Sequence, residues 1–134
     1  MGIVRLVRIV YFQFGEGGCK MKYGDDLRFS MSLKLWRNEK AFGPGIARLL
    51  ELVEEYESLN KAASIMGMAY SKVWKILNNS EKALGFPLIE RRIGGVGGGG
   101  ANLTEEGKEL LYAYRSFSEE ANKAVGELFK KYFL

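Results

Sequence analysis

The chain has 134 residues, of which 47% are apolar, so it is long enough to bury the core of one domain and its composition argues against global disorder. It has no histidine, which removes the commonest general base and the commonest metal ligand, and its single cysteine, Cys19, has no intrachain partner for a disulfide. Residues 58–104 hold six basic and two acidic side chains, so this segment carries +4 and points either to a polyanionic partner or to a solvated basic face.

An apolar run at residues 3–14 lies near the start of the chain. It is interrupted by Arg5 and Arg8 and is far shorter than the ~20 residues that a membrane-spanning helix needs. No small-residue cleavage site follows it, so a signal peptide is not expected. We treat residues 1–26 as an N-terminal extension without an assigned role, and we expect a cytoplasmic protein with no membrane partner.

Residues 27–36 alternate between apolar and polar side chains, which is the period of a half-buried strand. Residues 37–42 then resemble a turn and a short return strand, so an N-terminal β-hairpin is predicted. The apolar positions of the first strand are Leu27, Phe29, Met31, Leu33 and Leu35.

Two helices are expected next. In residues 43–57, Pro44 suits the first helical turn, where its missing N–H would have no partner. In residues 58–67, Ser58 is placed to cap the start and Gly67 to adopt the left-handed conformation that ends a helix. The expected buried stripes are Ile46, Leu49, Leu50 and Val53 in the first helix and Leu59, Ala62, Ala63 and Met66 in the second.

A third helix is expected at residues 68–85, where Gly85 and Pro87 end it. Its polar face carries Lys72 and Lys75 beside Ser71. Its other face carries Tyr70, Val73, Trp74 and Leu77, of which Trp74 is expected in the core, while Tyr70 is compatible with either the core or the surface.

A glycine-rich loop follows, between an expected strand at 87–93 and a return strand at 101–104. Gly95, Gly97 and Gly100 match the spacing G-x-G-x-x-G, but a dinucleotide site requires a helix directly after that motif within a β-α-β unit. A strand-like ANLT follows instead, which favours a hairpin whose tip approaches phosphates through backbone N–H groups over a nucleotide cradle or a linker.

Residues 104–134 are expected to form one long helix, with Thr104 as its cap. Its apolar residues recur at spacings of three and four, as in a heptad seam. A partner helix from a second copy is the simplest way to cover this seam, and a helix lying on its own domain is the alternative. The seam residues are Leu110, Tyr114, Phe117, Ala121, Ala124 and Leu128.

Two short helices joined by GMAY indicate a helix-turn-helix, and the following strand–loop–strand with Arg91 and Arg92 indicates a wing. The predicted fold class is α+β and mainly helical: a winged helix-turn-helix with an N-terminal β-hairpin and a long C-terminal dimerisation helix. The expected domains are residues 27–104 for DNA binding and 105–134 for dimerisation.

The sequence resembles the N-terminal domain of the molybdate-dependent regulator family ModE and, more distantly, LysR-type regulators. The resemblance covers roughly residues 27–120 and rests on the FGPG turn, the AASIMGMAY turn region, the ERRIGGVGGGGANLT wing and the LKLW hairpin. It implies an operator-binding dimer. Residues Ala69, Tyr70, Ser71, Lys72 and Trp74 then open the recognition helix, and 91–100 form the wing.

The chain departs from this family at three places. The family often has serine where this chain has Ala69, so a helix cap is lost, and often two arginines where it has Ser71 and Lys72, which leaves the operator sequence open. Family members also carry molybdate-binding domains, whereas this sequence ends at Leu134, so we expect no direct molybdate binding and no cofactor. The expected DNA-binding residues are Lys61, Tyr70, Ser71, Lys72, Lys75, Arg91, Arg92, Gly97, Gly98 and Thr104.

The function expected from these features is sequence-specific transcriptional regulation through double-stranded DNA, with genes of molybdate or oxyanion transport or molybdenum metabolism as targets. No catalysis is expected, because carboxylate pairs such as Glu54 and Glu55 are adjacent in sequence and point apart on a helix. The alternative is a protein-interaction module that uses the helix-turn-helix only as a scaffold. The concentration of positive charge in residues 58–104 favours DNA.

Overall fold

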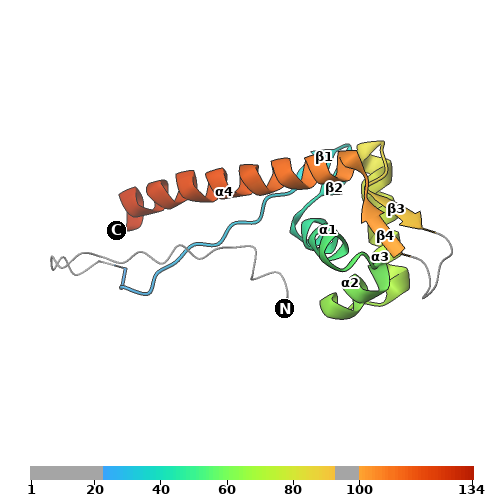
Figure 1. Ribbon diagram of the computed structural model, residues 1–134. Coiled ribbons are helices and arrows are strands. Elements are labelled where there is room, and N and C mark those ends of the chain that lie inside the picture. The colour runs from blue at the N-terminus through green and yellow to red at the C-terminus, as the bar shows by residue number, and fades with distance from the viewer. Residues whose placement is uncertain (1–22, 93–99) are drawn as a thin grey trace.

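The computed structural model describes residues 23–92 and 100–134, which form a compact helical head and one long helix that projects from it (Figure 1). Two small antiparallel sheets accompany four helices, which confirms the predicted α+β, mainly helical winged helix-turn-helix. In chain order the elements are β1 (Leu35–Arg37), β2 (Glu39–Phe42), α1 (Pro44–Tyr56), α2 (Leu59–Met66), α3 (Tyr70–Leu84), β3 (Ile89–Arg92), β4 (Gly100–Leu103) and α4 (Glu105–Phe133).

The N-terminal hairpin is shorter than predicted. Only Leu35–Arg37 pairs with β2, and residues 27–34 form an extended arm that belongs to neither sheet. The alternation is nevertheless real, since Phe29, Met31 and Leu33 are half-buried and their polar neighbours are exposed. Alternation of apolar and polar residues indicates that one face of a segment is covered. A β-strand also needs a neighbouring strand to hydrogen-bond with, and β2 is only four residues long.

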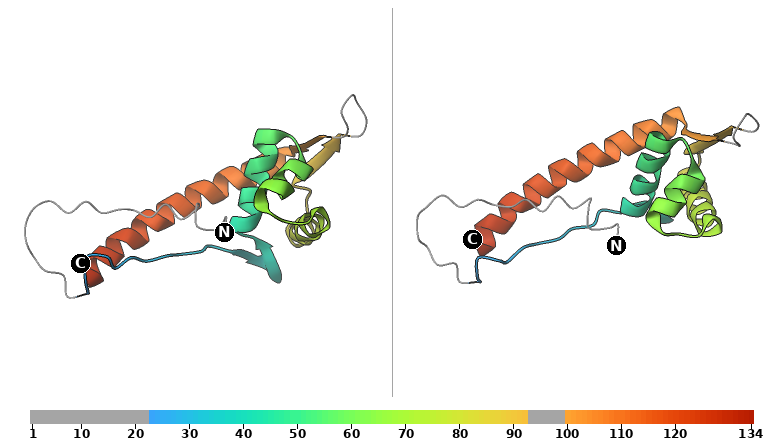
Figure 2. Two further views of the ribbon diagram at one scale, coloured as in Figure 1. Left: turned by 90° about the horizontal axis from the view of Figure 1, so that it is seen from below. Right: turned by 60° about the horizontal axis from the view of Figure 1, so that its bottom comes forward.

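The arm is covered by α4, along which it runs in the opposite direction (Figures 1 and 2). The ring of Tyr23 lies 5.7 Å from that of Phe133, and the ring of Phe29 lies 5.3 Å from that of Phe129, measured between centroids. Nearer the head, the Tyr114 hydroxyl donates a 2.8 Å hydrogen bond to the carbonyl oxygen of Leu33. The half-buried side chains of the arm therefore pack on a helix rather than within a sheet.

One hydrophobic core joins the head to the first turns of α4. Leu50 and Leu52 of α1 and Leu77 of α3 are fully buried, as is Leu111 of α4. The β1–β2 hairpin is attached to α3 by polar contacts: the Ser80 hydroxyl donates to the Ala41 carbonyl. Arg37 donates to the carbonyl of Leu84 at 2.8 Å, near the end of α3.

The ends of the helix pair follow the expected capping chemistry. The Ser58 hydroxyl accepts a 3.1 Å hydrogen bond from the N–H of Lys61, and Gly67 ends α2 in the left-handed conformation at φ 67°. Gly85 ends α3 in the same way at φ 86°. Ala69 is the N-cap of α3, and no side chain caps that end, as the missing serine predicted.

We expect Ala69→Ser to stabilise the fold by about 1 kcal/mol, because a hydroxyl at the N-cap accepts from an otherwise unpartnered N–H of the first turn. Ala69 already has the extended backbone of an N-cap, at φ −62° and ψ 139°, so serine fits without rearrangement. Chemical denaturation measures the gain. Ala113→Ser, at an exposed position inside α4, is the control and is expected to be neutral or slightly destabilising. Equal behaviour of the two variants would contradict the capping argument.

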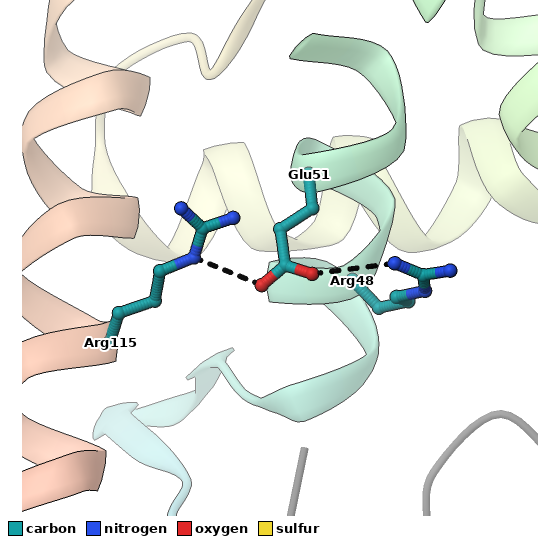
Figure 3. Close-up of polar contacts among 3 residues, drawn as sticks. All are labelled: Arg48, Glu51 and Arg115. Atoms are coloured by element: carbon teal, nitrogen blue, oxygen red, sulfur yellow. Dashed lines mark hydrogen bonds and ion pairs between the residues drawn. The ribbon is translucent and has the colours of Figure 1, made fainter. Parts of the chain in front are cut away.

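The long helix α4 starts inside the head. The Thr104 hydroxyl caps it by accepting from the N–H of Gly107 at 2.9 Å. Arg115 on α4 donates a 3.0 Å hydrogen bond to Glu51 on α1, and Arg48 lies 3.5 Å from the other oxygen of that carboxylate (Figure 3). The first three turns of α4 are thus held by α1, and the remainder projects from the head. At 29 residues, α4 is about 43 Å long.

Candidate nucleic-acid interface

The polar face of α3 is open to solvent. Ser71, Lys72 and Lys75 are all exposed in its first two turns, and Asn78 and Lys82 continue the same face toward its C-terminal end. The opposite face is fixed in the core by Val73 and Leu77. The buried side therefore orients α3 so that a continuous face with three lysines points outward.

The hairpin β3–β4 lies beside α3 and projects from the end of the head remote from the free end of α4 (Figure 1). Its strands pair from Ile89 with Leu103 to Arg92 with Gly100, and the predicted glycine-rich tip lies between them in residues 93–99, outside the described residues. The strand β4 begins at Gly100, the last glycine of the G-x-G-x-x-G motif, as expected for a hairpin and contrary to a dinucleotide site, which requires a helix there.

Both strands of this hairpin are hydrogen-bonded to neighbouring helices. The Glu81 carboxylate on α3 accepts from the N–H groups of Leu88 and Ile89, at 2.8 and 3.3 Å. The N–H of Ala101 in β4 donates to the carbonyl of Glu57 at the end of α1, at 3.0 Å. The hairpin thus has a defined position relative to α3, as a wing beside a recognition helix requires.

Arg91 points from β3 toward the start of α3. Its guanidinium carbon lies 3.5 Å from the ring centroid of Trp74, and its Nη2 donates a 3.1 Å hydrogen bond to the hydroxyl of Tyr70. The rings of Tyr70 and Trp74 meet edge to face, with centroids 6.2 Å apart. We call Tyr70, Trp74 and Arg91 the wing–helix cluster.

Arg92 points the other way, as alternation along a strand requires. Its Nη2 lies 3.8 Å from the Glu57 carboxylate, and both side chains are more than half exposed. The guanidinium also lies over Gly100 of β4, where a Cβ would collide with it. Screening by water makes this a weak pair, so the Arg92 cation stays available to an anion.

The remaining candidate residues divide into three groups. Lys61 is exposed at the start of α2, with its Nζ 5.9 Å from the ring centroid of Tyr56. Gly97 and Gly98 lie outside the described residues. Thr104 does not join the exposed surface, because it is buried and its hydroxyl also donates to the Pro87 carbonyl at 2.7 Å. We therefore remove Thr104 from the candidate DNA contacts.

The wing–helix cluster was missed by the sequence reasoning, which placed Trp74 in the core. Trp74 does pack against the core, but it is only half-buried, and Arg91 covers its face. Tyr70 and Trp74 are one helical turn apart, so their shared edge of α3 is visible in the sequence. Nothing local to either residue indicates that an arginine 17 positions after Trp74 lies over that edge.

A stripe on α4 faces neither the head nor the arm. Phe117 is 50% exposed and Leu128 is 52% exposed, Ala124 between them is exposed, and Ala121 is half-buried. Leu110, the first residue of the predicted seam, does not belong to this stripe, because it is half-buried against the core of the head. Tyr114 departs from the expected seam, because it is buried with its ring 5.0 Å from that of Phe42. The 3.6-residue repeat turns Tyr114 toward the core of its own head, so the exposed stripe starts beyond it.

A helix-turn-helix with an exposed basic second helix and an adjoining wing defines the class: a DNA-binding domain of the kind found in bacterial transcriptional regulators. Residues 47–108 match the family model of the bacterial regulatory helix-turn-helix proteins of the lysR family. The match includes the α2–α3 helix pair and both strands of the wing. None of the helices in residues 23–92 and 100–134 is long and apolar enough to cross a membrane.

The particular resemblance is to ModE, as the sequence predicted. The chain is 33% identical over 81 residues to the molybdenum transport protein ModE of Azotobacter vinelandii, covering 60% of this chain and 30% of that protein. It is 33% identical over 99 residues to the DNA-binding transcriptional dual regulator ModE of Escherichia coli K12, which covers 73% of this chain and 37% of that protein. It is 29% identical over 107 residues to the molybdenum-pterin-binding protein MopB of Rhodobacter capsulatus, which covers 80% of this chain and 40% of that protein. The chain thus spans 30 to 40% of the length of these relatives.

Proposed function

We propose that this protein is a cytoplasmic, homodimeric transcriptional regulator that binds operator DNA with α3 in the major groove and the β3–β4 wing beside the phosphate backbone. The observation that carries the proposal is the exposed face of α3 with Lys72 and Lys75, next to a hairpin in fixed position. Lysines on such a face contact phosphates and base edges, and Lys61 and Arg92 extend the positive charge on either side.

The symmetry of the DNA site follows from the symmetry of the proposed dimer. A two-fold dimer presents two recognition helices, which read half-sites separated by whole turns of the duplex. The exposed stripe on α4 supports self-association, because Phe117 and Leu128 are at least half exposed and follow Arg115, whose side chain bonds to Glu51 on α1. We propose a palindromic operator for this reason.

The target genes are proposed from similarity. A relative named molybdenum transport protein ModE is similar to this chain over 81 residues. We propose that the operators lie upstream of genes for the transport or metabolism of molybdate or a similar oxyanion. Binding of molybdate itself is not part of the proposal for this chain.

Fluorescence anisotropy on labelled duplexes from upstream of the protein's own gene and of molybdenum-transport genes tests DNA binding. A dimer that contacts about 6–10 phosphates is expected to lose three to five decades of affinity between about 50 and 200 mM salt. Each lysine occurs twice in a dimer, so Lys72→Ala and Lys75→Ala are each expected to lower the salt slope by roughly 1.8 if both copies contact phosphate.

Lys123→Ala is the matched control, since it removes the same charge from an exposed position far along α4. It is expected to retain the wild-type slope. Affinity weaker than about 100 μM for every duplex at low salt would overturn the proposal, because ordinary nonspecific binding is tighter than that. The protein-interaction alternative would then be favoured, with α4 as the surface to examine.

A further inference from the structure

Arg91 differs from the other exposed cations of the interface in being held by aromatic side chains of the recognition helix. Its guanidinium is stacked on Trp74 at 3.5 Å and bonded to Tyr70 at 3.1 Å. Lys72 and Lys75, by contrast, are exposed on the open face of the same helix. The position of Arg91 is therefore set within the protein before any DNA arrives.

The hydrogen bond from Arg91 determines that the Tyr70 hydroxyl acts as an acceptor toward the arginine. A guanidinium has only donors, so the hydroxyl oxygen of Tyr70 must accept from Arg91. The hydroxyl proton is then left to donate to another group. Tyr70 is the first residue of α3 and is 40% exposed, at the end of a recognition helix that meets base edges.

We propose that Arg91 is a positioning residue, which locks the wing to the recognition helix and orients the Tyr70 hydroxyl as a hydrogen-bond donor toward the DNA. This inference rests on the proposed DNA-binding function. Tyr70 then selects acceptors, namely a phosphate oxygen or the major-groove acceptors of guanine, adenine or thymine, and disfavours the amino group of cytosine. Arg91 itself stays on Trp74 in the complex.

The chemistry requires arginine at this position. A guanidinium is planar and weakly hydrated, so it stacks on an indole while its edge donates, whereas a lysine ammonium is a strongly hydrated point charge. Arg91→Lys keeps the charge and any simple phosphate contact, but loses the stacked, bonded geometry. The substitution therefore distinguishes the effect of the stacked arginine geometry from the effect of the positive charge.

The test combines a double-mutant cycle with tryptophan emission. Affinity is measured on the labelled upstream duplexes for wild type, Arg91→Lys, Tyr70→Phe and the double variant, with Arg48→Lys, away from the wing on α1, as the control. We expect each single change to weaken binding about tenfold, equal to ~1.4 kcal/mol. We expect the double variant to bind little more weakly than either single variant, because both changes disrupt the same Arg91–Tyr70 interaction.

Trp74 is observed separately in a Trp36→Phe background, which removes the second tryptophan at a position that is 68% exposed. Without DNA, Arg91→Lys is expected to shift Trp74 emission to longer wavelength as its ring gains water. In the Arg91 protein, DNA is expected to leave that emission unchanged. Tyr70→Phe keeps the ring beside Trp74, so it remains informative if Arg91→Lys fails to fold.

Three results overturn the inference while leaving DNA binding intact. They are wild-type affinity in Arg91→Lys, additive losses in the cycle, and a DNA-induced change in Trp74 emission that shows Arg91 leaving the ring. Absence of salt-dependent binding by the wild-type protein is a different failure, since it removes the proposed function and the inference with it.

Discussion

Gly107→Ala is expected to destabilise the protein by about 2–3 kcal/mol or more, the effect of forcing extra volume into a packed interior. Gly107 is buried in the first turn of α4, and a Cβ built there would collide with the backbone carbonyl oxygen of Leu88. That carbonyl accepts from the N–H of Thr104 at 3.0 Å, so it cannot move without loosening the junction between the wing and α4. Thermal unfolding should show the loss as a fall in Tm of roughly 10 °C.

Gly126→Ala is the matched control, because it makes the same change in the same helix. A Cβ at Gly126 would meet the Phe29 ring at 4.0 Å, an ordinary contact. Inside a helix, alanine is also more favourable than glycine by about 1 kcal/mol. Gly126→Ala should therefore be as stable as wild type or more so, and equal losses in the two variants would show that the Leu88 contact is not the cause.

The second large effect is expected on the proposed dimer. Phe117→Glu combined with Leu128→Glu should raise its dissociation constant at least 1,000-fold, which is ~4 kcal/mol. The physical reason is that burying each such apolar side chain contributes about 1.5–3 kcal/mol, and a two-fold interface loses each contact twice. Sedimentation analysis should find a dimer for wild type and a monomer for the variant.

Tyr112→Glu controls for added charge on α4, since Tyr112 is 75% exposed on a different face of the helix. It should remain dimeric. The monomeric variant should keep its circular dichroism and thermal unfolding profile apart from the effect of dissociation, because both replaced side chains are at least half exposed. It should also bind DNA more weakly, since one recognition helix reads one half-site. A wild-type monomer, or a variant that stays dimeric, would place the dimer interface elsewhere.

The two hairpin residues Arg91 and Arg92 show where sequence reasoning stops. Consecutive residues of a strand point to opposite sides, and the structure places Arg91 on Trp74 and Arg92 near Glu57. Neither partner follows from spacing, because each lies on another helix whose distance is set by the packing of the whole head. The same holds for Tyr114, whose heptad position is compatible with either a partner helix or its own core.

The sequence by itself determined the helices, their caps at Ser58 and Gly67, the wing hairpin and the basic segment. These features depend on residues within a few positions of one another, through periodicity, backbone preference and capping bonds. The tertiary structure alone decided that residues 27–34 lie along α4, that Gly107 must lack a side chain, and that the wing–helix cluster forms. Each of these depends on which surfaces meet when separate elements pack, and no local pattern contains that information.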